Sequence, residues 1–368
     1  MKSVLYLGHF HEQTAYSQAA SDYVESLVSV GVNVVCRSIK LNSTNGETTT
    51  LVSELLKKPI ADISHCIFHV LPHHFSYSNQ FKNIGMFIYD TSNSHYEWNK
   101  NLQLMNEIWT PTNYSKRAIP SYVNRPVKIV PHSTDITKFN KVYQKPFIAE
   151  IEGTYKFYFI GEVSKRKNVS DIVRAFHCEF KRHEPVSLVL KVSIPGKSPD
   201  EAAKLVSEDC NKIKAETRLY PCIENYKPEV IITNRITDQQ LYGLHTYCDC
   251  YVSASKGENW NIPLADAVGF GNSTVFYDSN KTSMYPYLRG ENLGRISLDS
   301  EPVFGYNTSP FQFIGSSREL WLKSDVKSLQ HQMRLAYENR NVVRPKRDMN
   351  DFSYEKVGQI MKGLLSDG

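Results

Sequence analysis

The stretch that most constrains the fold lies at residues 251–276, YVSASKGENWNIPLADAVGFGNSTVF. A short apolar run opens it, a polar loop follows, and Asn261 stands where a helix N-cap is expected. Pro263 falls just inside the next helix, where its missing N–H costs nothing, and Gly271 is typical of a helix C-terminus. A second apolar run follows at residues 274–276. The stretch therefore predicts a strand–loop–helix–strand unit.

Such a unit places the free N–H groups of a helix N-terminus at the carboxyl edge of a sheet, where α/β proteins bind phosphorylated ligands. Two carboxylates bracket that point, because Glu258 lies in the loop and Asp266 in the second helical turn, with seven residues between them. A capped βαβ unit without any ligand has the same pattern, since short motifs often match by chance. The residues alone leave both interpretations open.

The stretch also resembles the signature of the retaining glycosyltransferases of family four, S-x-x-E-G-x-G-x-P-x-x-E-A-x-x-x-G. The matching positions are Ser255, Glu258, Pro263, Asp266, Ala267 and Gly271. Asp266 replaces the second glutamate, and Asn259 and Asn261 replace the two glycines. The resemblance implies an α/β chain with the GT-B fold, in which two Rossmann-like domains face a central cleft and a C-terminal helix crosses back to the first domain.

The chain of 368 residues is long enough for two domains of ordinary size. We expect an N-terminal acceptor-side domain at residues 1–148, completed by a C-terminal helix within 350–368, and a C-terminal donor-binding domain at 149–349. Apolar periodicity and capping residues predict the main helices at residues 15–30, 169–179, 199–216, 238–248, 262–270, 321–339 and 352–365. The loop-rich stretch 279–317 is interpreted only as an insertion.

The loop GEVSKRKN at residues 161–168 follows an apolar strand and precedes a helix. It resembles the family pattern G-R-L-x-x-x-K-G, whose Arg and Lys bind the donor diphosphate. Lys167 matches the Lys, whereas Glu162 stands at the Arg position and reverses its charge. Either Lys165 or Arg166 takes the place of that Arg, or the diphosphate is bound more weakly. The alternative is a solvated basic turn.

A polar turn after the expected strand 85–91 carries Asp90. The region resembles a family-four subgroup in which Glu-Thr stands where this chain has Asp90-Thr91, and P-H-G-V-D where it has Pro131-His132-Ser133-Thr134-Asp135. Asp90 is interpreted either as a turn cap or as a polar group that faces the reacting sugar. Both interpretations remain open.

The resemblance implies transfer of a hexosyl or pentosyl group from a nucleotide sugar to an acceptor hydroxyl, with retention at the anomeric carbon. The expected catalytic residues are Lys167 and Arg166, which would stabilise the leaving diphosphate, Glu258, which would contact the sugar, and Asp90, which would face the reacting sugar. The residues expected to bind the nucleotide are Asp266 for the ribose, Asn261 and Ile262 through backbone N–H groups, Asn234 and Arg235 for the base, and Gly161.

No cofactor is expected beyond the donor as co-substrate, with UDP or GDP as its nucleotide. No metal is expected either, because the sequence has no Asp-x-Asp cluster for Mg²⁺. Four histidines, His65, His69, His73 and His74, are close in sequence, but they span a strand and a loop and therefore do not predict a zinc site. The seven cysteines form no CxxC pair, which favours reduced thiols in a cytoplasmic protein.

The net charge of +5 is mild, and the basic residues Lys116, Arg117, Arg125 and Lys128 are too few for a nucleic-acid face. A glycan or small polar acceptor is therefore favoured over a polyanion, whether a modified nucleic acid or an anionic membrane surface. Two other functions stay open for the same fold. One is a catalytically impaired protein that binds nucleotide sugars or glycans, which the loss of the family Arg at Glu162 favours, and the other is an epimerase.

Overall fold

A computed structural model describes residues 3–12, 14–40, 46–288, 294–305, 315–342 and 346–366. The chain forms two compact units, Met1–Thr137 with Asp348–Gly368 and Lys138–Arg347. The sequence placed the boundary later, at 148/149. The structure assigns the intervening residues to the second unit because their aromatic side chains pack there: Phe139 lies against Phe270 and Tyr143 against Tyr242. These anchors have no periodicity in the sequence that would have revealed them.

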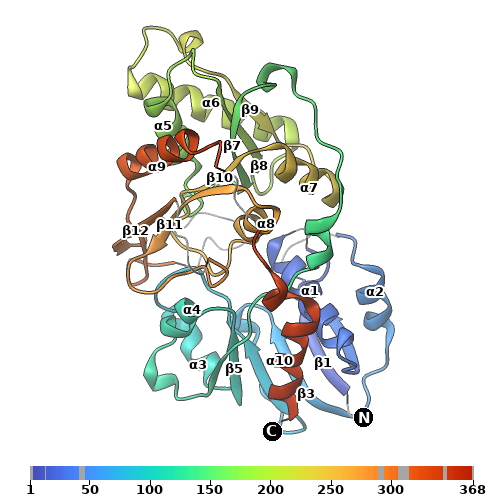
Figure 1. Cartoon of the computed structure of the whole chain (residues 1–368). Coiled ribbons are helices and arrows are strands. Elements are labelled where there is room, and N and C mark those ends of the chain that lie inside the picture. The colour runs from blue at the N-terminus through green and yellow to red at the C-terminus, as the bar shows by residue number, and fades with distance from the viewer. Residues whose placement is uncertain are drawn as a thin grey trace. The chain divides into compact units, whose positions relative to one another are not determined.

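The first unit is built on a parallel sheet, blue to cyan in Figure 1. Among the described residues its six strands run in the order β2-β1-β3-β4-β5-β6. Their bounds are β1 (Ser3–Gly8), β2 (Val34–Ser38), β3 (Ile63–His69), β4 (Lys82–Met86), β5 (Glu107–Thr110) and β6 (Val127–Ile129). The helices of this part of the chain are α1 (Ala15–Ser29), α2 (Thr50–Lys57), α3 (Asn99–Leu102) and α4 (Asn113–Ala118).

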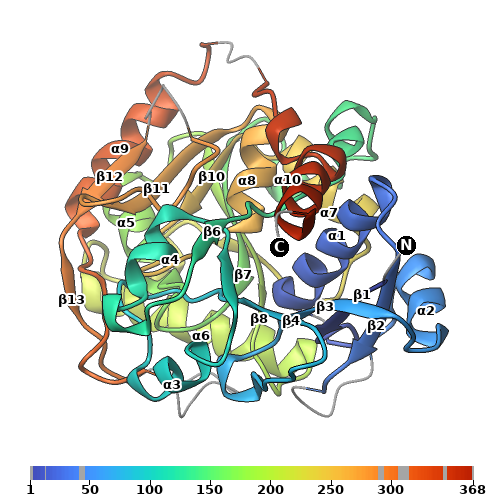
Figure 2. The same ribbon diagram turned by 90° about the horizontal axis from the view of Figure 1, so that it is seen from below.

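The C-terminal helix α10 (Tyr354–Ser366) completes the first unit by packing on α1, as Figures 1 and 2 show. Val357 and Met361 are fully buried in the core cluster that also contains Val4 and Leu27. The two helices approach so closely that a Cβ added at Gly358 would lie 2.2 Å from the carbonyl oxygen of Ser26. The expected return of the last helix to the first domain is confirmed.

The second unit repeats the architecture with a second parallel sheet. Within the described residues its six strands are ordered β12-β11-β10-β7-β8-β9. Their bounds are β7 (Tyr155–Glu162), β8 (Val186–Ser193), β9 (Glu229–Ile232), β10 (Cys250–Ser253), β11 (Ser273–Ser279) and β12 (Arg295–Leu298). A short antiparallel ribbon pairs β13 (Ser300–Pro302) with β14 (Leu320–Leu322).

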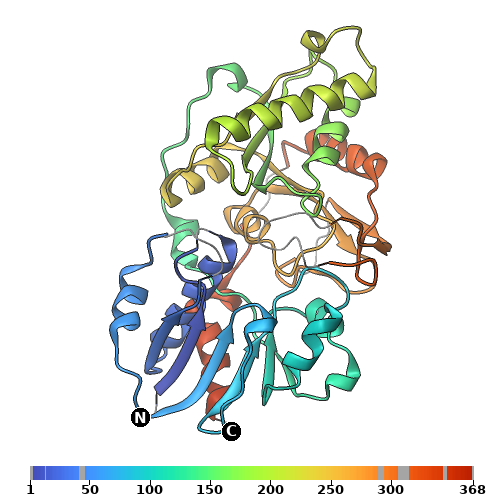
Figure 3. The same cartoon turned by 180° about the vertical axis from the view of Figure 1, so that it is seen from behind.

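Its helices are α5 (Val169–Glu179), α6 (Pro199–Thr217), α7 (Asp238–Tyr247), α8 (Ile262–Phe270) and α9 (Val326–Glu338). The long helix α6, yellow-green in Figure 3, contacts α5 and β9. Helices α6 and α7 begin with complete capping boxes, at Ser198 and Thr237. Local capping chemistry therefore explains why these bounds agree with the sequence prediction.

Two predicted elements were wrong in extent. The strand expected at 85–91 is β4, which begins at Lys82 and ends at Met86. The sequence did not reveal the start of this strand, because the polar residue Asn83 lies there. Asn83 can be buried because its side-chain amide donates hydrogen bonds to the Ser78 carbonyl and to the Asn106 side chain. The helix expected from residue 321 begins only at Val326.

The residues before Val326 belong to strand β14 and to a cap. Asp325 is that N-cap, and its carboxylate accepts the Ser328 N–H at 3.0 Å. The sequence prediction started the helix too early, because it included the residues of β14 and the capping segment in the helix. The middle of the proposed insertion, at 306–314, lies outside the described residues.

All seven cysteines are free thiols. The buried ones are Cys36, Cys66, Cys210, Cys248 and Cys250, and burial raises the pKa of Cys36 and of Cys66 to about 12. The expectation that most of the cysteines are buried is thus confirmed. Of the helices that can be described, none is long and apolar enough to cross a membrane.

A buried charged cluster joins α5, α6 and the start of β9. Glu229 accepts hydrogen bonds from His177 and, at 2.7 Å, from Lys214. Burial alone would raise the pKa of Glu229, but these two partners outweigh it and the pKa lies below its usual value. The stabilisation is therefore present above the unfolded-state pKa and is lost as the pH falls through the folded-state pKa.

We expect Glu229→Gln to lower the free energy of unfolding by about 3–5 kcal/mol, because it leaves Lys214 buried without a counter-charge. Urea denaturation at pH 7 measures the change. The control is Glu208→Gln on the exposed side of α6, where the side chain is 59% exposed and a change within about 0.5 kcal/mol is expected. Equal stability of the two variants would contradict the role of the cluster.

Candidate functional site

Two loops of the second unit meet at the carboxyl edge of its sheet. One follows β7 and the other follows β10, and these parallel strands are neighbours although about 90 residues separate them in sequence. The N–H of Lys256 donates to the carbonyl of Arg166 at 2.8 Å, and the Arg166 guanidinium donates to the carbonyl of Gly257 at 2.8 Å. These bonds join the two loops that the sequence singled out.

Glu258 lies at the centre of this junction and is only 4% exposed. Its Oε1 contacts the Lys167 ammonium, the Arg166 Nη1 at 3.2 Å and the Ser255 hydroxyl at 2.8 Å. Burial acts to raise the pKa of Glu258, but Lys167 and Arg166 outweigh it and hold the pKa below the usual value. Glu258 is therefore an ionised carboxylate, and its two cations exceed it by one positive charge.

The structure distinguishes between the two candidates for the missing Arg of the family pattern. Arg166 joins the Glu258 cluster, and its side chain is 11% exposed. Lys165 is exposed and turns to another part of the surface. The Glu162 carboxylate lies 3.8 Å from Arg166 and balances the one positive charge that Glu258 leaves over, so the four side chains together carry no net charge. The sequence predicted Lys167, Arg166 and Glu258 as site residues, but the Ser255 contact was not assigned to the site.

The backbone conformations of Asn261 and Asn168 explain why asparagine can replace glycine at these two positions of the family patterns. Both have left-handed backbone conformations, with φ of 62° and 54°. Glycine adopts this region freely and asparagine is the side chain that tolerates it best, so each replacement keeps the turn. Asn261 also acts as the expected N-cap of α8: its Oδ1 accepts the Leu264 N–H at 3.3 Å, and Ile262 is the first helical residue.

Asp266 lies in a different buried environment from Glu258. Its Oδ1 is 2.6 Å from Lys138 Nζ, and both side chains are 7% exposed. The Lys138 ammonium also lies 5.2 Å from the ring centroids of Phe139 and Tyr242. Lys138 was missed because it stands in a short irregular segment without any motif. Its partner Asp266 thus already has a counter-ion, which the sequence could not show.

The other predicted residues of the second unit lie outside the Glu258 cluster. Gly161 pairs with Val192 one residue before the ladder of β7 ends at Glu162, so it lies close to the first loop. Asn234 and Arg235 are exposed in the loop after β9, and β8 lies between β9 and β7, which places that loop about 10 Å further along the sheet edge. Asp90 belongs to the first unit, where the burial of Tyr16 and, second, the charge of Asp90 raise the pKa of Tyr16.

The histidines of the first unit have other partners. The Nδ1 of His69 lies 2.7 Å from the Tyr6 hydroxyl, and the Nδ1 of His65 lies 2.9 Å from the Ser64 hydroxyl. Burial lowers the pKa of both rings. Over the ranges that the structure describes, no group of three or more His, Cys, Asp or Glu side chains is arranged to bind a metal ion.

Comparison with known proteins identifies the fold. No family model matches the chain, and no curated protein matches it in sequence. Solved structures do match over its full length. Anabaena HepE in complex with UDP has a TM-score of 0.67 at 11% identity and is covered completely. Trehalose-6-phosphate synthase OtsA has a TM-score of 0.66 at 8% identity, with 99% of that chain covered.

Sucrose-phosphate synthase from Thermosynechococcus elongatus has a TM-score of 0.64 at 11% identity, and 99% of its chain is covered. These proteins are GT-B glycosyltransferases. The chain therefore has the GT-B fold, as the sequence predicted.

We expect Asp266→Asn to lower the free energy of unfolding by about 3–5 kcal/mol, because Lys138 then remains buried without a counter-charge. The double variant Lys138→Met with Asp266→Leu removes both charges and should recover most of that loss. Denaturant unfolding of the two variants and the wild type measures this difference. A double variant that is no more stable than Asp266→Asn would show that the buried charge is not the cause.

Proposed function

We propose that the protein is a glycosyltransferase that moves a sugar from a UDP- or GDP-linked donor to an acceptor hydroxyl with retention of anomeric configuration. The observation that carries the proposal is the cluster of Arg166, Lys167 and Glu258 where the β7 and β10 loops meet. A solved GT-B structure that contains UDP, that of HepE, supports a nucleotide ligand and favours uridine.

The chemistry that the cluster can supply is stabilisation of a leaving diphosphate. As the glycosidic bond breaks, negative charge accumulates on the diphosphate, and fixed cations in a largely dry site stabilise it without reorganising. Lys167 and Arg166 are 14% and 11% exposed, and both are positioned beforehand by Glu258. Arg166 is held further by the Gly257 carbonyl.

Glu258 is assigned to positioning rather than to proton abstraction. Its pKa is lowered by Lys167 and Arg166 despite its burial, so it is a poor base at neutral pH. In our proposal it orients Lys167 and accepts hydrogen bonds from the hydroxyls of the transferred sugar. Asp266 would bind the ribose from the neighbouring helix, and Asn234 and Arg235 would contact the base. Retention rests on the resemblance to the family-four signature.

In our proposal the first unit binds the acceptor, and Asp90 is the polar side chain of that unit that acts on the reacting sugar. A glycan or small polar acceptor remains the proposal, because the basic residues Lys116, Arg117, Arg125 and Lys128 are few.

The second candidate is a protein that binds a nucleotide sugar without turning it over. The observation in its favour is Glu162, whose carboxylate stands 3.8 Å from Arg166 where the family has a cation.

Thermal-shift titration with UDP, GDP and their glucose conjugates tests the binding part of the proposal. A nucleotide present at about 100 times its dissociation constant should add roughly 2.7 kcal/mol to the free energy of unfolding. Release of UDP or GDP from the conjugate in the presence of oligosaccharide acceptors then separates the two candidates. Binding without release supports the binding protein, and the absence of any nucleotide effect overturns both.

We expect Lys167→Ala to lower kcat by about 10²–10³, because it removes a cation that interacts most strongly with the transition state. Stability should change little, since Glu258 keeps Arg166 and Ser255 as partners. Steady-state kinetics with the best donor measures the effect. The control is Lys204→Ala, whose side chain is 78% exposed on α6. Wild-type kcat in the Lys167 variant would refute the assignment.

We also expect activity to persist in excess EDTA, because basic side chains supply the charge that Mg²⁺ supplies in metal-dependent transferases. Initial rates before and after chelation measure this. Rates that vanish on chelation and return with Mg²⁺ or Mn²⁺ would contradict the metal-independent mechanism.

A further inference from the structure

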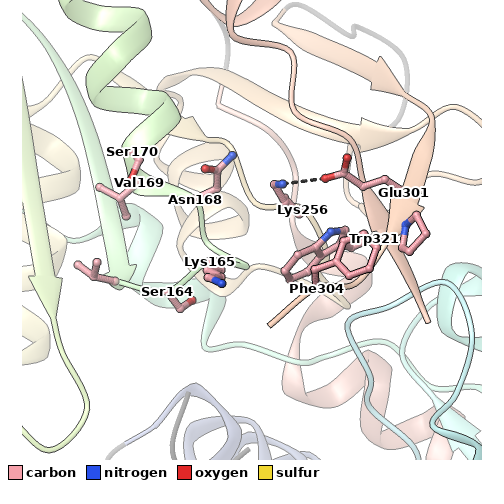
Figure 4. A pocket seen from close by; sticks show the side chains of 11 residues that line it. Ser164, Lys165, Asn168, Val169, Ser170, Lys256, Glu301, Phe304 and Trp321 are labelled. Carbon is pink, nitrogen blue, oxygen red and sulfur yellow. Dashed lines mark hydrogen bonds and ion pairs between the residues drawn. The ribbon is translucent and has the colours of Figure 1, made fainter. Parts of the chain in front are cut away.

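A cavity of about 430 Å³ opens on the second unit beside the Glu258 cluster but is lined by different side chains. Figure 4 shows its two walls. One wall is the loop 163–168 with the first residues of α5, and the other is the β13–β14 ribbon with the side chain of Lys256. Its volume falls in the range of small-molecule sites. Strand β13 belongs to the stretch 279–317 that the sequence analysis interpreted only as an insertion, and β14 lies where that analysis expected the start of a helix.

The ribbon supplies an aromatic wall. Trp321 is buried at 4% exposure, whereas Phe304 is 68% exposed, an unusual setting for a large apolar ring. The Lys256 ammonium lies 5.2 Å from the Trp321 ring centroid and donates to Glu301 at 2.8 Å. The wall thus combines apolar ring faces with a carboxylate and an ammonium that are already oriented by each other.

The opposite wall is polar and carries a free cation. The structure gives the Lys165 ammonium no ion pair or hydrogen bond within the described residues, and the side chain is exposed. Ser164, Asn168 and Ser170 add hydroxyl and amide groups along the same side. The lining has a net charge of +1, because it contains two lysines, Lys165 and Lys256, and one carboxylate, Glu301. One wall of the cavity thus offers aromatic faces, and the other offers hydroxyls, an amide and the Lys165 ammonium. This combination favours a ligand that has an apolar face, hydroxyl groups and a negative charge.

We propose that this cavity is a second carbohydrate site, which binds a sugar unit carrying an anionic group. The apolar C–H face of a pyranose packs on the Phe304 ring, as apolar ligand surface packs on aromatic walls. Glu301 and the polar groups of the 163–168 loop take the sugar hydroxyls. Lys165 pairs with the phosphate or carboxylate of the ligand.

The site is separate from the donor cluster, although the two share a scaffold. The loop 163–168 sends Arg166 and Lys167 to Glu258 and sends Lys165 to the cavity. The backbone continues this connection, because the Leu322 N–H donates to the Lys256 carbonyl at 2.6 Å and the Lys256 N–H donates to Arg166. Phe304 has no part in the cluster, so its removal separates the two sites in an experiment.

Isothermal titration calorimetry with glucose 6-phosphate, glucuronate, glucose and inorganic phosphate tests the proposal. Glucose 6-phosphate or glucuronate should bind, and the better of the two identifies the anionic group. Glucose and phosphate alone should bind at least tenfold more weakly, because glucose lacks the anionic group that pairs with Lys165 and phosphate lacks the apolar face that packs on Phe304. Phosphate that binds as tightly as glucose 6-phosphate would overturn the sugar part of the proposal.

Phe304→Ala and Lys165→Ala should each weaken binding of the better probe at least tenfold. Matched controls are Phe147→Ala, at a ring that is 80% exposed, and Lys204→Ala, both expected to bind as the wild type does. UDP is titrated in parallel, and Phe304→Ala should leave its affinity unchanged. Probe binding that survives both cavity variants, or no binding of any sugar probe by a protein that binds UDP, would overturn this site while leaving the proposed function intact.

Discussion

The buried carboxylate of Glu258 is the interaction on which the rest of the site depends. A charge that is 4% exposed is tolerated only where cations and hydrogen bonds replace the lost water, and Lys167, Arg166 and Ser255 do so. Two of these partners come from the loop after β7, so the ion pairs also fix that loop against the loop after β10. The same ion pairs therefore neutralise the buried Glu258 carboxylate and fix the two loops against each other.

Sheet topology makes that constraint possible. β10 enters the sheet next to β7, and parallel neighbours end at the same edge, so both loops meet there despite their distance in sequence. The left-handed conformations of Asn168 and Asn261 then turn each loop into its helix, α5 or α8. A β-branched residue at either point would be strained, which explains why the glycine pattern changes only to asparagine here.

The sequence predicted what is encoded locally. The bounds of α5 and α8 follow from apolar periodicity, from Pro263 and from the cap at Gly271, all of which act within a few residues. The pairing of Lys138 with Asp266 was not predictable, since it depends on where an irregular segment packs. The sequence predicted Arg166 as a site residue but left Lys165 open as the replacement for the missing Arg, because adjacent side chains in a loop have no fixed period. Only the backbone conformation decides which one meets Glu258.

The two carboxylates of the signature consequently have different electrostatic environments. Glu258 balances two cations that keep 11–14% of their surface exposed, so a ligand can still reach the cluster. Asp266 and Lys138 are each 7% exposed and lie against aromatic rings, where a one-to-one ion pair leaves no surplus charge. Their atoms are already in contact at 2.6 Å, and a glutamate would add a methylene to a close-packed interior. The shorter aspartate at this position thus fits the distance to Lys138. The replacement of the family glutamate by Asp266 and the burial of Lys138 therefore depend on each other.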